Sequence, residues 1–266
     1  MSRSGAHWVA VAVVLASRVA AAQSVVLSIR PHAGDTLHMR YDQRVETIAT
    51  TSERGHADTT SSIVSTLLVL SRTIIESADS TGADIVAVTD SVAATSSGGR
   101  MPESAEAARQ MLQGKDVHLH LSPDGTIVAE DSGASPEVRS MFAAMPAILP
   151  KAPTPVGRRW KREMDGPIGS ATGHTEVKTT FQLDSLSRGG DLAYVSVRGT
   201  VLQSSDGPGP QKGESSGTVT GTVLLDLRRG WVTESRDRIV ITSVIRARDA
   251  KLRIKMTVTQ WLRAID

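Results

Sequence analysis

A short serine motif is the part of this chain that most resembles a catalytic site. Residues 213–217 read Gly-Glu-Ser-Ser-Gly, which matches the Gly-x-Ser-x-Gly pattern around the nucleophile of many serine hydrolases. That nucleophile sits between a strand and a helix, and its base is a histidine later in the chain. Here a loop rich in glycine and proline precedes the motif, the strand-like residues 218–220 follow it, and the last histidine is His174. We therefore assign no catalytic residue and predict that the protein is not an enzyme.

Two histidines have a spacing that suits metal binding. His118 and His120 lie two residues apart, so on a strand both imidazoles point to the same face. Zinc needs a further ligand from a neighbouring strand, and the chain has no cysteine to supply a thiolate. The apolar residues Val117, Leu119 and Leu121 occupy the opposite face, which we expect to be buried. The simpler interpretation is that both histidines face solvent, and we predict neither a metal site nor a cofactor.

An apolar stripe on a predicted helix is the candidate binding site. The helix is expected at residues 135–146, where a serine supplies the N-cap and a proline the first helical position. Its apolar residues recur at helical spacing and are Val138, Met141, Phe142 and Met145. Methionine adapts to varied apolar shapes and is common at promiscuous apolar surfaces. Two interpretations stay open: the helix covers a bound apolar ligand, or it fills the core of the protein.

Alternation of apolar and polar residues dominates the rest of the chain. Residues 37–46, 176–183 and 252–259 alternate with a period of two, which predicts strands with one buried and one solvated face. Such strands belong to antiparallel sheets, because parallel strands are usually buried on both faces. Further strands are expected at 24–31, 61–78, 83–95, 116–122, 125–131, 158–165, 191–204, 215–227 and 231–246.

These elements predict a mainly β fold built on one large, curved antiparallel sheet. About 11–12 strands would form this sheet. Two short helices, at 102–114 and 135–146, are expected to cover its concave face. A proline-rich link at 150–155 is the one candidate seam. Because the strands on both sides of it look alike, we expect a single domain over residues 23–266.

The first 22 residues have the features of a secretory signal peptide. Arg3 precedes an apolar run at residues 8–16, and Ala20-Ala21-Ala22 supplies the small residues of a cleavage site. The apolar run is much shorter than the roughly 20 residues of a transmembrane helix. We expect cleavage near Ala22-Gln23 and a soluble mature protein in the periplasm or outside the cell.

Charge is balanced in the mature chain but unevenly distributed. Residues 23–150 carry nine basic and 16 acidic side chains, whereas residues 151–266 carry 19 basic and 12 acidic ones. The balance between the two halves and the 3% aromatic content argue against nucleic-acid binding. The basic segment 228–263 has two interpretations. It faces an anionic membrane or partner, or it is the solvated outer face of a sheet.

The overall pattern resembles a group of exported bacterial proteins. Long meandering strands and a helical insertion are followed by Pro155-Val156-Gly157-x-x-Trp160, which opens a second set of strands. This arrangement is similar to the periplasmic lipoprotein-carrier superfamily, and the resemblance implies an open half-barrel with helices as a lid. The best-known carriers bind acyl chains in the half-barrel, but no residue of this chain matches a motif that would carry that activity over.

The resemblance implies a non-enzymatic exported protein that binds a lipid, a lipoprotein or another apolar ligand. The dry concave face and the apolar helix would form the site, and the basic C-terminal strands would face an anionic membrane or partner. The alternative is a structural or interaction module of the cell envelope with a filled core and no ligand pocket.

Overall fold

Strands account for most of the residues that the structure places. The computed structural model describes residues 24–97, 110, 113–114, 116–128, 149–166, 174–204, 212–246 and 250–265. The predicted leader, residues 1–22, lies outside them. The strands, in chain order, are β1 Ser24–Val25, β2 Thr36–Glu53, β3 Thr59–Ala78, β4 Ala83–Ser96, β5 Asp116–Leu121, β6 Ile127–Val128, β7 Thr154–Pro155, β8 Arg159–Gly166, β9 His174–Leu186, β10 Leu192–Ser204, β11 Lys212–Asp226, β12 Trp231–Arg246 and β13 Ala250–Ala264.

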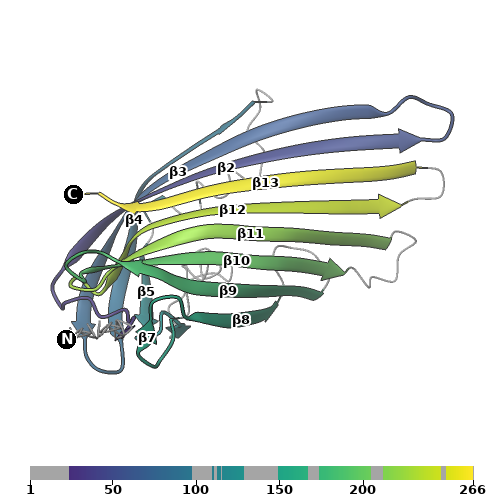
Figure 1. Cartoon of the computed structure of the whole chain (residues 1–266). Helices are drawn as coiled ribbons and strands as arrows, with labels where there is room; N and C mark the ends of the chain where they lie inside the picture. Colours follow the sequence, from purple (N-terminus) through teal and green to yellow (C-terminus); the bar gives the residue numbers. More distant parts are fainter. Residues whose placement is uncertain are drawn as a thin grey trace, which may run out of the picture.

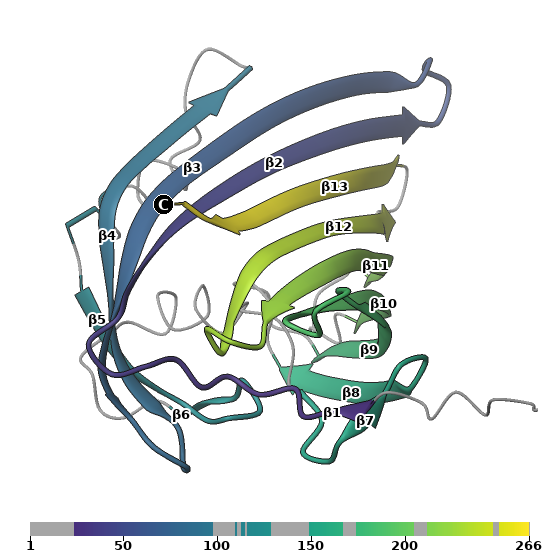
Figure 2. The same ribbon diagram turned by 60° about the vertical axis from the view of Figure 1, so that its left-hand side comes forward.

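Eleven of these strands form one antiparallel sheet, in the order β6-β5-β4-β3-β2-β13-β12-β11-β10-β9-β8. Neighbours in the sheet are neighbours in sequence except where β2 pairs with β13, which joins the N-terminal and C-terminal parts of the chain (Figure 1). The sheet curves strongly, so one face is concave and the other convex (Figure 2). Among the described residues no ladder joins the end strands β6 and β8, so the sheet is open. The predicted mainly β fold with a large antiparallel sheet is confirmed.

The predicted strands and helices have different outcomes. β12 has the bounds expected from the sequence, and β3, β4 and β10 differ from the prediction by one or two residues at an end. The strand predicted at 24–31 is mostly wrong, since only Ser24 and Val25 pair, with β7. The predicted helix at 135–146 lies outside the described residues, and the one at 102–114 is described only at Gln110, Gln113 and Gly114. Gln110 is helical, but no helix has described bounds, so the predicted helical cover remains a prediction.

The N-terminal segment, residues 24–35, forms a strap across one end of the curved sheet. Its backbone donates hydrogen bonds from Ile29 N to Pro123 O and from Arg30 N to Gly230 O, both 2.8 Å long. These bonds tie the turn between β5 and β6 to the turn between β11 and β12, which are far apart in the sheet order (Figure 2). Leu27 and Ile29 are buried in the core. The strap therefore packs by its side chains rather than by joining the sheet.

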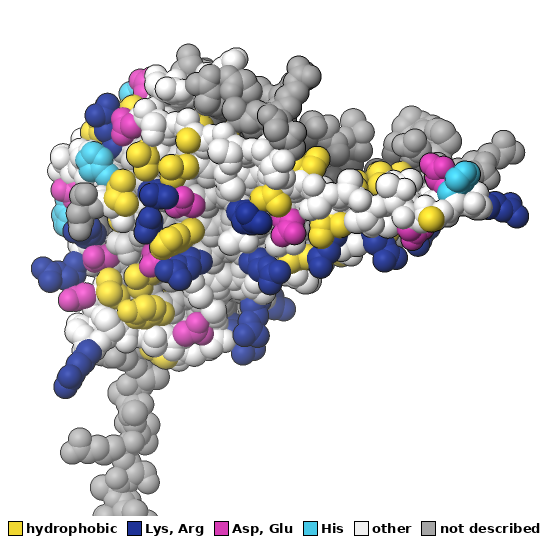
Figure 3. Space-filling view, turned by 90° about the horizontal axis from the view of Figure 1, so that it is seen from above, with side chains coloured by type: hydrophobic (Ala, Val, Ile, Leu, Met, Phe, Trp, Pro, Cys, Tyr) yellow, Lys and Arg dark blue, Asp and Glu magenta, His cyan; other side chains and the backbone are white. Residues whose placement is uncertain are grey.

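The buried core lies at the end of the sheet that the strap crosses. Its side chains come from the parts of β2–β5 and β9–β12 that meet there. Its largest fully buried members are Leu27, Met39, Ile75, Leu149, Leu183 and Leu225. At the other end β2, β3 and β11–β13 run on into an extension that is narrower than the body (Figure 3) and whose residues are mostly partly or fully exposed. Within the described chain, no helix has the length and apolar character needed to cross a membrane.

Candidate functional site

The register of the strands places inward side chains in rows that cross the sheet. We call the face that bears the buried core the inner face; it is the concave one (Figure 2). One row lies at the margin of the core, and it runs through Val69, Tyr41, Leu262, Ser235, Val223, Val195 and Leu183. Most of these side chains are buried. On β9 and β10 buried side chains continue past this row, at Phe181, Val197, Val177 and Val201. On β2, β13, β12 and β11, Val258 is the one buried residue farther toward the extension among those the structure describes.

The next row toward the extension is polar. In register across β2, β13, β12 and β11 it consists of Gln43, Gln260, Asp237 and Gly221, and we call these four residues the polar row. Gln43 Nε2 donates a 2.9 Å hydrogen bond to Tyr41 Oη in the preceding row. A side chain at position 221 would collide with the Asp237 carboxylate. Glycine at that position thus leaves the space that the carboxylate occupies.

The electrostatics of the polar row are set by burial. Desolvation raises the pKa of the Asp237 carboxyl above its usual value, and a hydrogen bond from Ser235 Oγ to Oδ2, 2.8 Å long, opposes this shift. Burial also raises the pKa of Tyr41 to about 12, with the negative charge of Asp237 adding to the effect. Hydrogen bonds from Gln43 and Gln260 lower the same pKa. An acid and a phenol therefore share a poorly solvated site at the margin of the core.

Beyond the polar row the inner face is mostly apolar but not fully buried, and its polar inward residues are Thr47, Thr51, Ser215 and Ser243. We call the inward residues of β2, β13, β12 and β11 on this side the distal inner face. Its apolar and small members, by register, are Val45, Ala49, Val258, Met256, Ile254, Leu252, Ile239, Ile241, Ile245, Val219 and Gly217. Of these only Val258 is buried; the others are partly exposed wherever their side chains are described. Apolar side chains in a continuous, partly exposed patch are typical of surfaces that bind a partner or a ligand.

Glycines on the inner face allow strands to approach closely. A Cβ added at Gly217 would lie 2.6 Å from Val240 O, and one at Gly199 would lie 2.7 Å from Lys178 O. Both distances are shorter than real Cβ contacts, so the backbone would have to shift. Glycine inside a strand commonly marks a bend or a close approach of another backbone. These glycines are therefore part of the reason why the sheet curves as it does.

The outer, convex face of the extension is basic. Six exposed cations on β2, β12 and β13 form what we call the basic patch, and they are Arg44, Arg238, Arg246, Lys251, Arg253 and Lys255. No described acid lies within ion-pair distance of any of them, and Glu46 is the acidic residue that the register places among them. Lys and Arg side chains continue from the broad end of the molecule along the extension (Figure 3). The patch therefore carries a net positive charge.

Nearer the body, the outer face carries an aromatic residue between two arginines. The guanidinium carbons of Arg236 and Arg263 lie 4.7 Å and 4.1 Å from the centroid of the Trp261 ring. Both are within cation–π range. Trp261 Nε1 donates a 3.1 Å hydrogen bond to Glu234, which also forms an ion pair with Arg236. Arg236 is thus compensated by Glu234, unlike the cations of the basic patch, and Arg263 packs on the Trp261 ring.

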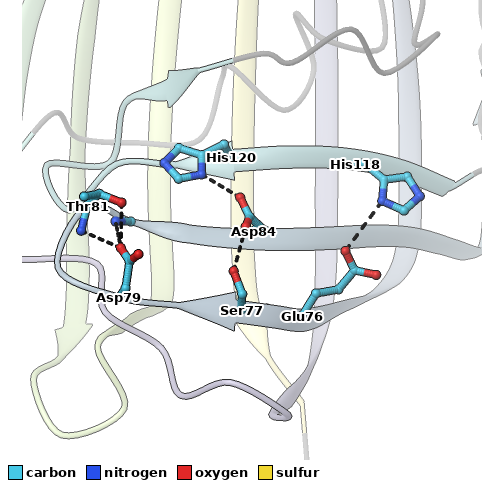
Figure 4. A network of polar contacts seen from close by, with 8 residues as sticks. Glu76, Ser77, Asp79, Thr81, Asp84, His118 and His120 are labelled. Carbon is cyan, nitrogen blue, oxygen red and sulfur yellow. Dashed lines mark hydrogen bonds and ion pairs between the residues drawn. The ribbon is translucent and has the colours of Figure 1, made fainter.

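The two histidines lie on the outer face and do not converge (Figure 4). His120 Nδ1 lies 2.6 Å from Asp84 Oδ1, and this contact is the main cause that lowers the pKa of Asp84. His118 Nδ1 lies 3.8 Å from Glu76 Oε2. Each imidazole thus faces a different carboxylate, and no group of three metal-ligating side chains occurs in the described chain. The geometry explains these residues as surface ion pairs and hydrogen bonds.

The serine motif lies in a strand. Ser215 is an inward residue of β11, and its Oγ is 2.7 Å from Oγ of Ser243 on β12. The strand continues through Gly217 to Asp226, so the strand–turn–helix setting of a hydrolase nucleophile does not occur at this position. The apolar stripe predicted as the binding site, Val138, Met141, Phe142 and Met145, lies outside the described residues.

Sequence reasoning missed the polar row, although a local signal for it exists. Along β12 the inward positions read Ser235, Asp237, Ile239 and Ile241, so an acid stands where the alternation calls for an apolar residue. Gln43 and Gln260 interrupt their own apolar series in the same way. Each interruption is visible in the sequence alone. Only the register between strands shows that the three fall in one row.

Comparisons with known proteins do not assign the chain to a family. No protein-family model and no curated protein matches it. Among solved structures, an outer membrane channel from Pseudomonas putida F1 is similar at 9% sequence identity, over 88% of this chain and 96% of that chain, with a TM-score of 0.19. A superposition this weak carries no argument about fold or function. The resemblance to lipoprotein carriers therefore remains a prediction from the sequence.

Proposed function

We propose that this protein is a non-enzymatic binding protein of the cell envelope, exported to the periplasm or beyond, that holds a lipid or another apolar ligand on its distal inner face. The observation that supports the proposal is the contrast between two parts of one face. The inward side chains of Leu183 and Leu225 are completely buried, whereas Ile241 and Met256, on the same face, are partly exposed.

Burial of an alkyl chain against this surface supplies the binding energy. Each methylene removed from water contributes roughly 0.8 kcal/mol, while association costs about 4 kcal/mol or more in lost freedom of motion. Short tails therefore bind weakly, and a long alkyl or acyl chain is the natural ligand class. No reacting group is needed for this function.

The basic patch suggests how the protein meets its ligand source. Six exposed cations without described acidic partners attract an anionic membrane surface, where each Lys or Arg contributes about 1 kcal/mol. The patch lies on the outer face of the same strands that carry the distal inner face. We propose that the extension rests with its outer face on anionic lipid while the inner face holds the ligand.

Ligand binding is tested with two matched variants on β12. Ile241→Glu places a charge on the distal inner face, and Val240→Glu places the same charge one residue away on the outer face. Both residues are partly exposed. We expect the wild-type protein to enhance the fluorescence of an apolar dye, to keep this property in V240E and to lose most of it in I241E. Native mass spectrometry of gently purified protein is expected to show a bound lipid that I241E lacks.

Two results would count against binding at this face. One is a homogeneous ligand-free mass with no dye response, which favours the structural or interaction module. The other is equal binding by I241E and V240E at equal thermal stability, which places any ligand elsewhere.

The membrane contact needs its own experiment. Arg253→Glu with Lys255→Glu reverses two charges in the basic patch, and Arg228→Glu reverses one in the exposed turn between β11 and β12. We expect sedimentation with vesicles of phosphatidylcholine and phosphatidylglycerol to fall at least tenfold for the double variant and little for R228E. Neutral phosphatidylcholine vesicles should bind neither wild type nor variants. Unchanged sedimentation of the double variant would refute the membrane contact.

A further inference from the structure

The polar row has no role in binding an apolar tail, yet it lies at the inner end of the distal inner face. Polar groups are placed there at a cost, since burying a carboxylate without a charged partner is unfavourable. The cost is visible at Asp237, whose pKa is raised by desolvation. A site that keeps such a group needs a reason other than packing.

Asp237 has unused binding capacity. Its Oδ2 accepts a hydrogen bond from Ser235, while Oδ1 makes no hydrogen bond with the described residues. No Lys, Arg or His among the described residues lies within ion-pair distance of this carboxylate. An ionised carboxylate can accept about four hydrogen bonds, and most of these acceptor positions have no partner among the described residues.

The charged neighbours of Asp237 on β12 do not neutralise it. Arg236 and Arg238 flank it in sequence, but successive side chains on a strand point to opposite faces, so both lie on the outer face. Arg236 there pairs with Glu234 and stacks against Trp261. By register, Asp237 is the only acidic or basic residue at an inward position of β12, β13 and β11 in the described chain. The inner face of these strands therefore carries one negative charge among apolar and neutral polar residues.

We infer that the polar row binds the protonated amine head group of an amphiphile whose alkyl tail lies along the distal inner face. An ammonium group donates up to three hydrogen bonds, to Asp237 Oδ1 and to the side-chain oxygens of Gln260 and Gln43 on the same row. It also supplies the positive charge that the carboxylate lacks. The inference rests on the proposed function, since it names the class of ligand for the same face.

The dimensions of the face suit such a ligand. From Asp237 to Ile245 the inward residues of β12 cover eight residue steps, which at about 3.3 Å per residue span about 26 Å. Apart from Ser243, the inward residues after Asp237 on this strand are isoleucines. An extended fatty alkyl chain fits along this length with its head at the polar row.

The test compares head groups on one tail. Dodecylamine, dodecanol and dodecanoate share a tail and differ in charge and hydrogen bonding, and all three are titrated below their micelle concentrations in a displacement assay with the apolar dye. We expect wild type to bind the amine at least tenfold more tightly than the carboxylate, with the alcohol between them. Asp237→Asn should reduce this preference to less than about threefold while the alcohol still binds. The matched control is Asp184→Asn, which removes the same charge from an exposed residue that accepts a hydrogen bond from Ser196, and it should keep the full preference.

The outcomes separate the two proposals. Equal binding of amine and carboxylate by wild type, or a preference that survives in D237N, refutes the amine site and leaves apolar binding intact. Binding of none of the three compounds refutes both. A thermal unfolding curve for D237N with a single transition at or above the Tm of wild type shows that a lost preference reflects the missing charge rather than a misfolded protein.

Discussion

Gly217→Ala is the most direct test of how the inner face is built, because two effects of opposite sign act on it. Glycine within a strand is less favourable than alanine by roughly 0.5–1 kcal/mol, owing to its larger conformational entropy in the unfolded chain. If nothing else changed, the variant would be more stable than wild type. The structure opposes this gain, because the new Cβ would lie 2.6 Å from Val240 O and 3.0 Å from Ile241 Cγ1.

The contact with Val240 decides the sign. A backbone carbonyl of the neighbouring strand cannot rotate away as a side chain can, so β11 and β12 must separate locally. Overpacking of this kind costs about 1–3 kcal/mol, which exceeds the entropic gain. We expect a net destabilisation of about 1–2 kcal/mol, which lowers Tm by about 2–8 °C for a chain of this size.

Differential scanning calorimetry of ligand-free protein measures the effect. The matched control is Gly189→Ala in the turn before β10, where the nearest atom to an added Cβ is the flexible carboxylate of Asp191 at 3.4 Å. Its Tm should change little, by the equivalent of about 0.5 kcal/mol or less. A Tm for G217A equal to or above that of wild type would show that the close approach of the strands does not hold the sheet in its curved form.

Three further predictions address the strap, the buried acid and the histidines. Leu27→Ala removes a strap side chain that is 1% exposed and should lower the unfolding free energy by roughly 2–5 kcal/mol. Val26→Ala, at a neighbouring side chain that is 48% exposed, should lower it by about 0.5 kcal/mol or less. Similar Tm values for the two variants would mean that the strap does not anchor in the core. Because burial raises the folded-state pKa of Asp237, its ionised carboxylate destabilises the fold, and this destabilisation is absent below the unfolded value of 3.8 and complete above the folded value. D237N should therefore raise Tm at about pH 7 and lose this advantage near pH 3 to 4. An equal gain in Tm at both pH values would contradict the raised pKa of Asp237. Zinc should leave Tm unchanged in wild type and in His118→Ala, since His118 and His120 face separate carboxylates; a zinc-dependent rise that H118A abolishes would establish a metal site.

The strands were predictable because alternation is a local property. β13 alternates apolar and polar residues from Ala250 to Thr259, and its exposure alternates in step from Lys251 to Met256. Turn chemistry is equally local: Pro123-Asp124-Gly125 lies in the turn between β5 and β6, where Gly125 takes a φ of 82° that favours glycine. An antiparallel sheet follows from such strands joined by short turns.

The strap shows where local reasoning failed. Apolar residues at 25–29 alternate imperfectly and suggest a strand, and only Ser24 and Val25 pair. Beyond them, Leu27 and Ile29 fill space at the end of the core, and the backbone bonds to Pro123 and Gly230 replace a sheet ladder. Those two partners lie about 90 and 200 residues away in the chain, so no window of sequence contains the interaction.

The features of the candidate site also differ in whether a short stretch of sequence contains them. The serine motif, the paired histidines and the apolar stripe each lie within a short stretch of sequence. The polar row is built from single residues on three separate strands, with a glycine on a fourth.

By itself, the sequence determined most of the strands, their antiparallel sense and the side of each that faces the core, because a period of two is encoded residue by residue. It also determined that the C-terminal part is basic. The tertiary structure decided which strands are neighbours, and β2 beside β13 is the pairing that brings Gln43 and Gln260 together. It also decided that the apolar face is buried at one end and partly exposed at the other, because burial depends on what covers a residue from elsewhere in the chain.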